Sequence, residues 1–128
     1  MPLVLMKRNF KKIRTPDPAN FREVKEAMPQ IVADALSAPA DTDGELGPED
    51  VNVWGVLMEN IVWGDICQHD LEIVVFAHNF PSRIANIEER KQQIINKVKL
   101  LLQKGTTFFV RVICSPTSWG ESVGEFEG

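Results

Sequence analysis

The chain contains the same strand–helix–strand pattern twice, and this repeat constrains its fold more than any other feature. The first unit spans residues 2–65 and begins with a β-rich segment over Leu3–Arg8. Apolar residues then recur at helical spacing to about Ser37, and a second β-rich segment starts at Val51. Because Pro29 lies inside the helical pattern, we expect the helix to be kinked or split there.

The second unit spans residues 71–121 and has the same order of elements. A dense run of β-branched and aromatic residues predicts a strand over Leu71–His78. Ile87–Gln103 carries apolar residues at helical spacing, and Gly105 is expected to end that helix. A last strand is predicted over Thr107–Cys114.

Two such units predict one α/β domain over residues 1–128, with a polar tail over residues 122–128. We expect two tandem βαβ units that form a four-stranded sheet with both helices on one face. Alternate residues of Ile73–Phe76 and Phe108–Ile113 would line the other face, and the sequence offers no further helix to cover them. Symmetric self-association is the usual way to cover such a face, so we expect a homo-oligomer.

Composition and charge indicate an ordinary single domain. The chain has 128 residues, 44% of them hydrophobic and 25% charged, which suits one core. A net charge of −4 argues against nucleic acid or an anionic membrane as a partner. No apolar run approaches the ~20 residues that span a bilayer. Cys67 and Cys114 lack metal-ligand spacing, so we expect reduced thiols and no metal. We also expect no cofactor and a cytoplasmic location.

Pro2 is the residue with the most distinctive potential chemistry. Removal of the initiator Met1, which is usual before a small residue, would leave the Pro2 nitrogen as a free secondary amine. An α-amino group titrates near ~8 in water, and burial or a nearby cation lowers its pKa toward that of a general base at neutral pH. If Met1 is retained, the same nitrogen belongs to an amide and cannot act as a base.

Two arginines of the second unit stand in a pattern that resembles the tautomerase superfamily. Ser82-Arg83 follows the unit's first strand, Val110-Arg111-Val112-Ile113 lies in its last strand, and Trp119-Gly120 follows. With the amino-terminal proline, this arrangement is similar to that of the superfamily. The interval between the arginines resembles that of 4-oxalocrotonate tautomerase. Chain length and Ala27-Met28-Pro29 look most like the 5-carboxymethyl-2-hydroxymuconate isomerase branch.

This resemblance implies an isomerase that moves a proton next to a carbonyl group in a small carboxylate-bearing substrate, a 2-hydroxydienoic or 2-keto acid. Pro2 would be the general base, and Arg111 would hold a carboxylate or stabilise the enolate oxygen. Arg83 and Trp119 would contact the substrate. Fused two-unit members assemble as trimers, so the resemblance also implies a homotrimer.

The first unit departs from the family pattern. Asn52 stands where the strand arginine is expected, and the second unit has no free proline. Each unit would therefore supply half of one site, with the base from the first and the arginines from the second. A trimer could join these halves across a subunit interface.

Each candidate residue also has a structural interpretation. Arg111 can be solvated or paired with a carboxylate, and Trp119 can pack at an interface. Arg83 can be an exposed turn residue or a partner of a helix end. Glu88–Lys91 is most simply a solvated helix face, and Asp41–Asp50 an acidic loop without calcium-binding spacing. Two alternatives therefore stay open: a non-catalytic trimeric binding protein, and a proline-dependent hydratase, dehalogenase or decarboxylase of small acids.

Overall fold

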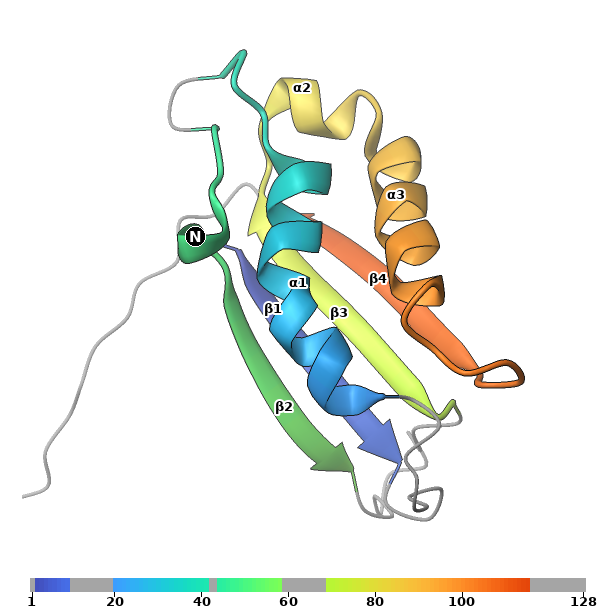
Figure 1. Cartoon of the computed structure of the whole chain (residues 1–128). Helices are drawn as coiled ribbons and strands as arrows, with labels where there is room; N and C mark the ends of the chain where they lie inside the picture. The colour runs from blue at the N-terminus through green and yellow to red at the C-terminus, as the bar shows by residue number, and fades with distance from the viewer. Residues whose placement is uncertain (1, 10–19, 42–43, 59–68, 116–128) are drawn as a thin grey trace, which may run out of the picture.

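A computed structural model describes residues 2–9, 20–41, 44–58 and 69–115 (Figure 1). Four strands form one mixed sheet in the order β2-β1-β3-β4. The strands are β1 (Leu3–Asn9), β2 (Asn52–Met58), β3 (Leu71–His78) and β4 (Phe108–Ser115). The helices are α1 (Phe21–Leu36), α2 (Pro81–Ile84) and α3 (Ile87–Lys99), with a short 3-10 helix, η2 (Pro48–Asp50).

The pairing of the strands confirms the two-unit architecture. β1 runs parallel to β2, and β3 runs parallel to β4, as two strands joined by a helical crossover should. The two units meet where β1 and β3 pair antiparallel, with Val4 opposite Val75 and Met6 opposite Ile73. The predicted four-stranded α/β sheet is therefore confirmed, and the first strands of the two units form its centre.

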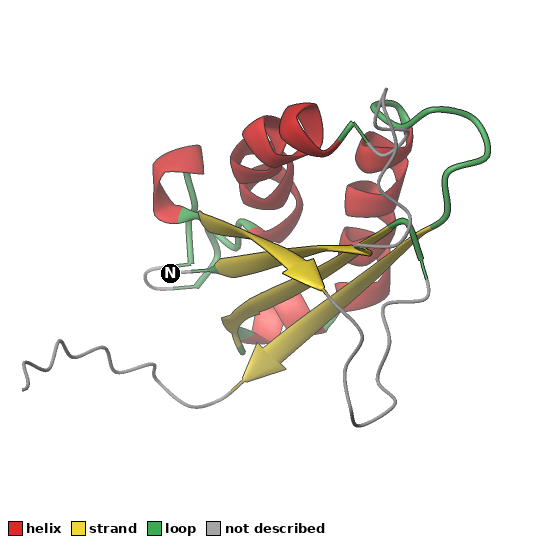
Figure 2. Ribbon diagram, turned by 90° about the horizontal axis from the view of Figure 1, so that it is seen from below, coloured by secondary structure: helices red, strands yellow, loops and turns green. Residues whose placement is uncertain are grey.

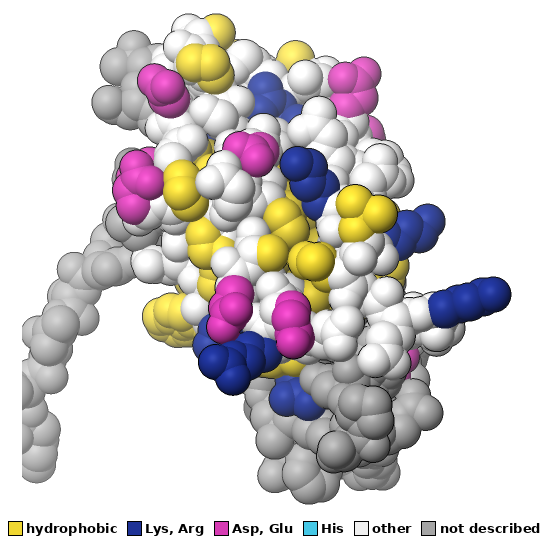
Figure 3. All heavy atoms as spheres, in the orientation of Figure 1, with side chains coloured by type: hydrophobic (Ala, Val, Ile, Leu, Met, Phe, Trp, Pro, Cys, Tyr) yellow, Lys and Arg dark blue, Asp and Glu magenta, His cyan; other side chains and the backbone are white. Residues whose placement is uncertain are grey.

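Both long helices cover the same face of the sheet (Figures 1 and 2). Alternate residues of the central strands point toward them, and these are fully buried: Val4, Met6, Leu71, Ile73 and Val75. The helices contribute the other half of the core through Val24, Met28, Val32, Ile94 and Val98. Apolar residues recur at every second position along the strands and about every 3.6 positions along the helices. They therefore form one apolar layer between the sheet and the helices. The outer surface of this side mixes charged and apolar side chains (Figure 3).

No helix of the described part of the chain covers the opposite face of the sheet (Figure 2). The strand register places Trp54, Leu5, Val74 and Arg111 in one row across this face, from β2 to β4. Trp54 is 61% exposed in the single chain. As expected, this sheet face lacks a helical cover among the described residues, and the row across it holds three apolar side chains beside Arg111.

The helix boundaries differ from expectation at two points. α1 is continuous across Pro29, so of the two expected outcomes, a kink or a split, the split is wrong. Burial of Val24 and Met28 before the proline and Val32 after it holds both halves of the helix against the sheet. α3 ends at Lys99 rather than Gln103, and Gly105, with φ +90°, instead forms the turn that leads into β4.

Pro29 is expected to lower the stability of this fold. Proline cannot donate the backbone hydrogen bond expected at this point of a helix, so Pro29→Ala should raise the free energy of unfolding by roughly 1–3 kcal/mol. Urea denaturation measures the change, with Gln30→Ala on the exposed side of α1 as the control. An unchanged or lower stability for Pro29→Ala would show that ring packing outweighs the missing bond.

Candidate functional site

Pro2 lies immediately before β1, at the edge of the buried layer. It is buried, and its carbonyl oxygen accepts a hydrogen bond of 3.0 Å from the backbone N–H of Asn52. Alternation along the strand places Pro2 on the helix-covered face with Val4. One further step in the β1–β3 register puts it opposite Ala77, which pairs in turn with Cys114. Pro2 therefore sits at one end of the sheet, in an apolar and enclosed position.

Arg83 lies at the same end of the sheet and on the same side. It belongs to α2, which begins at Pro81 directly after the β3–α2 turn, and it is only 1% exposed. Of its two structural interpretations, the exposed turn residue is therefore wrong, and the partner of a helix end is confirmed. Its Nε donates to the carbonyl oxygen of Leu36 at 2.8 Å, and its Nη1 donates to that of His78 at 2.8 Å.

These contacts cap the C-terminus of α1 with help from a second arginine. Arg90 of α3 donates through Nη1 to the carbonyl oxygens of Ala35 at 3.1 Å and Ser37 at 2.8 Å. The last carbonyls of a helix lack intrahelical donors and carry partial negative charge, so cations bind there favourably. The two guanidinium groups thus perform a structural task that the sequence pattern did not indicate for Arg90.

One nitrogen of Arg83 is left over. Nη2 is buried and makes no hydrogen bond to any residue that the structure describes. Burial lowers the pKa of the Arg83 guanidinium, whereas the neighbouring Cys114 and Asp41 raise it. The side chain also stacks over Phe80, with the guanidinium carbon 4.9 Å from the ring centre. A buried donor without an acceptor is costly, so this nitrogen has hydrogen-bonding capacity that no described residue uses.

Cys114 is the thiol of this end of the sheet. It is a free, half-buried cysteine whose pKa is raised by burial, while Arg83 and Arg90 act in the opposite direction. A raised pKa keeps sulfur in the thiol form, which is a poor nucleophile. Among the described residues, no group of three His, Cys, Asp or Glu side chains could hold a metal ion, and no helix is long and apolar enough to cross a membrane.

Arg111 stands apart from Pro2 and Arg83. It lies in the middle of the edge strand β4 and points to the uncovered face, opposite to the face that holds Pro2. The side chain is exposed, with its guanidinium carbon 5.2 Å from the ring centre of Phe109. Within one chain Pro2 and Arg83 therefore lie at the same end and on the same side of the sheet, whereas Arg111 faces the other side. Trp119 lies outside the described residues.

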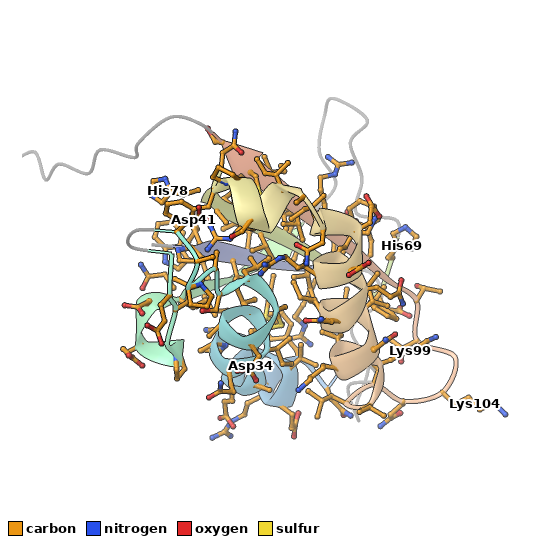
Figure 4. The ribbon with its side chains drawn as sticks, turned by 90° about the horizontal axis from the view of Figure 1, so that it is seen from above. Asp34, Asp41, His69, His78, Lys99 and Lys104 are labelled. Carbon is orange, nitrogen blue, oxygen red and sulfur yellow. The ribbon has the colours of Figure 1, made fainter. Side chains whose placement is uncertain are left out.

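Sequence reasoning missed two residues at this end of the molecule. Arg90 was assigned to a solvated helix face, but it binds the end of α1. Asp41 was assigned to a plain loop, but its Oδ2 accepts hydrogen bonds from the backbone N–H and the hydroxyl of Ser82. Figure 4 labels Asp41 and His78, which lie at the same end of the molecule, far from Lys104. No local pattern marks either residue, because both bind backbone or side-chain groups distant in sequence.

The capping contacts of Arg83 make a direct prediction about stability. Arg83→Met keeps most of the apolar stem but leaves the buried Leu36 carbonyl and the partly buried His78 carbonyl without this donor. The free energy of unfolding should therefore fall by roughly 2–4 kcal/mol. Chemical denaturation measures it. Arg22→Ala, which removes a surface arginine of α1 paired with Glu26, should change stability by less than about 0.5 kcal/mol. Equal effects of the two variants would contradict the capping role.

Comparison with known proteins supports the fold. No protein-family model matches the sequence, and the search of curated proteins finds no match. Among solved structures, a macrophage migration inhibitory factor-like protein from Entamoeba histolytica superimposes with a TM-score of 0.56 and 11% identity, covering 98% of both chains. Malonate semialdehyde decarboxylase aligns with a TM-score of 0.49 and 16% identity, covering 96% of this chain and 92% of the other. At 11% identity the likeness to the first of these structures concerns architecture alone, and it confirms the tautomerase-like α/β fold expected for the two-unit chain.

Proposed function

We propose that the chain is a tautomerase of a small 2-hydroxydienoic or 2-keto acid, with the Pro2 nitrogen as its general base. One observation carries this proposal. Pro2 is buried at the start of a central strand, at the end of a tautomerase-like sheet where Arg83 is also buried. Pro2 thus combines burial, a place directly before a central strand and a cation at the same end of the sheet.

The proposed reaction requires the Pro2 nitrogen to be a free amine, which means that Met1 is removed. Burial and a nearby guanidinium both favour the neutral form of an amine, and this is the form that accepts a proton. The amine takes the proton from a carbon or enol oxygen next to the substrate carbonyl. The resulting secondary ammonium then returns it to another carbon of the same dienol system, so the reaction needs no net gain or loss of protons.

In this proposal the two arginines bind the substrate from different subunits. Arg83 offers Nη2 to a carboxylate from within the chain that supplies Pro2, since its other contacts hold the guanidinium in place. Arg111 contributes to the same site from a neighbouring subunit, because its own Pro2 lies on the opposite sheet face. In this proposal Arg111 stabilises the enolate oxygen or holds a carboxylate, and Trp119 adds an apolar wall.

The proposed assembly is a homotrimer. Its contacts would cover the sheet face that carries Leu5, Trp54 and Phe76, which no described helix covers. Association would at the same time bring Arg111 of one subunit to the Pro2 end of the next. The site is thus incomplete in a single chain, and we propose that catalysis depends on assembly.

A non-catalytic binding protein on the same scaffold is the second candidate. The observation that favours it is the structural use of Arg83, whose Nε and Nη1 both bind backbone carbonyls. Asn52 in β2, where the family pattern has an arginine, points in the same direction. Hydration, dehalogenation or decarboxylation of a small acid by the same proline is the corresponding alternative within enzymes.

Ketonisation of 2-hydroxymuconate or phenylenolpyruvate, followed by ultraviolet absorbance, tests the proposed activity. Pro2→Ala replaces the secondary amine with a primary one of different geometry and basicity, so kcat/KM should fall by about 100-fold or more. Alanine is also small, so Met1 should be removed from both proteins, and intact mass checks this. Pro48→Ala, at an exposed position in η2, is the matched control and should retain wild-type rates.

Equal rates for wild type and Pro2→Ala, with Met1 absent from both, would overturn the tautomerase proposal. A rate that falls equally in Pro48→Ala would indicate a general loss of structure. Binding of the substrate acids without turnover would favour the non-catalytic candidate. Release of carbon dioxide or halide, or addition of water, would assign the proline to one of the alternative reactions.

A further inference from the structure

The loop after α1 reaches from the first unit to the second through the carboxylate of Asp41. Oδ2 of Asp41 accepts a hydrogen bond of 3.2 Å from the backbone N–H of Ser82, and the Ser82 hydroxyl donates to the same oxygen. Ser82 directly precedes Arg83 in α2. Apart from the arginine caps on α1, this contact is therefore a second tie between the two units at the end of the sheet that holds Pro2.

Hydrogen bonds of the described loop residues tie the segment that carries this carboxylate to the end of α1. Its turn closes through hydrogen bonds from Asp41 N to the Ala38 carbonyl at 3.0 Å and from Ala38 N to the Gly44 carbonyl at 2.7 Å. Gly44 has no room for a side chain, because a Cβ there would lie 2.1 Å from the Ala38 oxygen. Ser37 adds a further tie by accepting from the backbone N–H of Leu46 at 3.0 Å. Asp41 thus has a fixed place relative to the C-terminus of α1.

The contacts of Asp41 leave the spare nitrogen of Arg83 available. Asp41 is near enough to act on the Arg83 charge, but its hydrogen bonds go to Ser82. The guanidinium is held at Nε and Nη1, and Nη2 stays without a partner among the described residues. A direct Asp41–Arg83 ion pair would occupy this nitrogen. The observed arrangement instead fixes the backbone next to Arg83 and keeps one buried N–H group free.

We propose that Asp41 is a positioning residue for anion binding: by holding Ser82 it fixes α2, and so keeps Nη2 of Arg83 ready for a carboxylate at the Pro2 end of the sheet. The identity of that carboxylate, a 2-keto or 2-hydroxydienoic acid, rests on the proposed function. The link between Asp41 and the Arg83 guanidinium rests on the contacts alone. The two parts can therefore be tested separately.

Hydrogen exchange of the Arg83 Nε–H group, followed by nitrogen-15 NMR, tests the link without any need for activity. The resonance is assigned by its loss in Arg83→Lys. Asp41→Ala should speed exchange by about ten-fold, because α2 loses its hydrogen bonds to Asp41 and the Nε–H bond to Leu36 breaks more often. Asp41→Asn retains an acceptor oxygen and should restore most of the protection. Asp50→Ala is the matched control, since that carboxylate binds Gly47 within the same loop, and it should leave exchange unchanged.

Kinetics with phenylenolpyruvate test the positioning role. Asp41→Ala should raise KM by about five-fold and leave kcat within about two-fold, whereas a general loss of structure would lower kcat as well. In the Arg83→Lys background Asp41→Ala should cause no further rise in KM, because both substitutions act through the Arg83 guanidinium. Asp41→Asn should recover the wild-type KM.

Several results would overturn the inference. Exchange at Arg83 that is unchanged in Asp41→Ala, or equally fast in Asp50→Ala, contradicts the link. Fully additive effects of Asp41→Ala and Arg83→Lys on KM contradict the positioning role. If the wild-type protein shows no ketonisation, the proposed function fails. The positioning role is then tested by titration with phenylpyruvate, followed by the Arg83 Nε signal. A shift of the Arg83 Nε signal that weakens in Asp41→Ala supports the inference, and no shift overturns it.

Discussion

The hydrogen bonds between two arginines of the second unit and the last carbonyl groups of α1 organise one end of this molecule. Arg83 and Arg90 come from α2 and α3, yet they bind Leu36, Ala35 and Ser37 of the first unit. The helix end supplies partial negative charge and unpaired acceptors, and the buried guanidinium needs such acceptors to be tolerated. This contact therefore ties the helical layers of the two units together. At its other end, α1 is tied to the chain after α3 by Asn20, whose side-chain amide donates to the Leu101 carbonyl at 2.6 Å.

The same contact shapes the proposed site. Because Arg83 is held at two nitrogens, its third is fixed in place near the strand end where Pro2 is buried. The first unit supplies the proposed base and the Asp41 tie, and the second supplies the guanidinium. Arg111 faces the other side of the sheet, where it shares a row with Leu5 and Trp54. The proposed reaction, which uses all three groups, would therefore take place between subunits that associate through the uncovered sheet face.

Much of the fold follows from the sequence, and less of the site does. The strands were predictable because runs such as Leu71–His78 carry strong β-branched patterns, and both helices have apolar faces of the right period. The helix does not split at Pro29, because burial of its residues on both sides of the proline outweighs the local helix-breaking signal. Residue spacing identified Arg83 but not its burial, since one of its two acceptors, the Leu36 carbonyl, lies at the end of a helix 47 residues earlier. The contacts of Arg90 and Asp41 were not predicted for the same reason, because their partners become neighbours only after the two units pack.

Mixing of two inactivated proteins tests the shared site most directly. Pro2→Ala lacks the proposed base and Arg111→Ala lacks the proposed partner group, so each homo-oligomer should lose most of its ketonisation activity, Arg111→Ala by several-fold or more. When the two variants are unfolded together and refolded as mixed trimers, about a quarter of the sites combine an intact Pro2 with an intact Arg111 from the next subunit. We predict that ketonisation recovers to about that fraction of the wild-type rate. A mixture no more active than the average of the two variants would contradict a site built from Pro2 of one subunit and Arg111 of its neighbour.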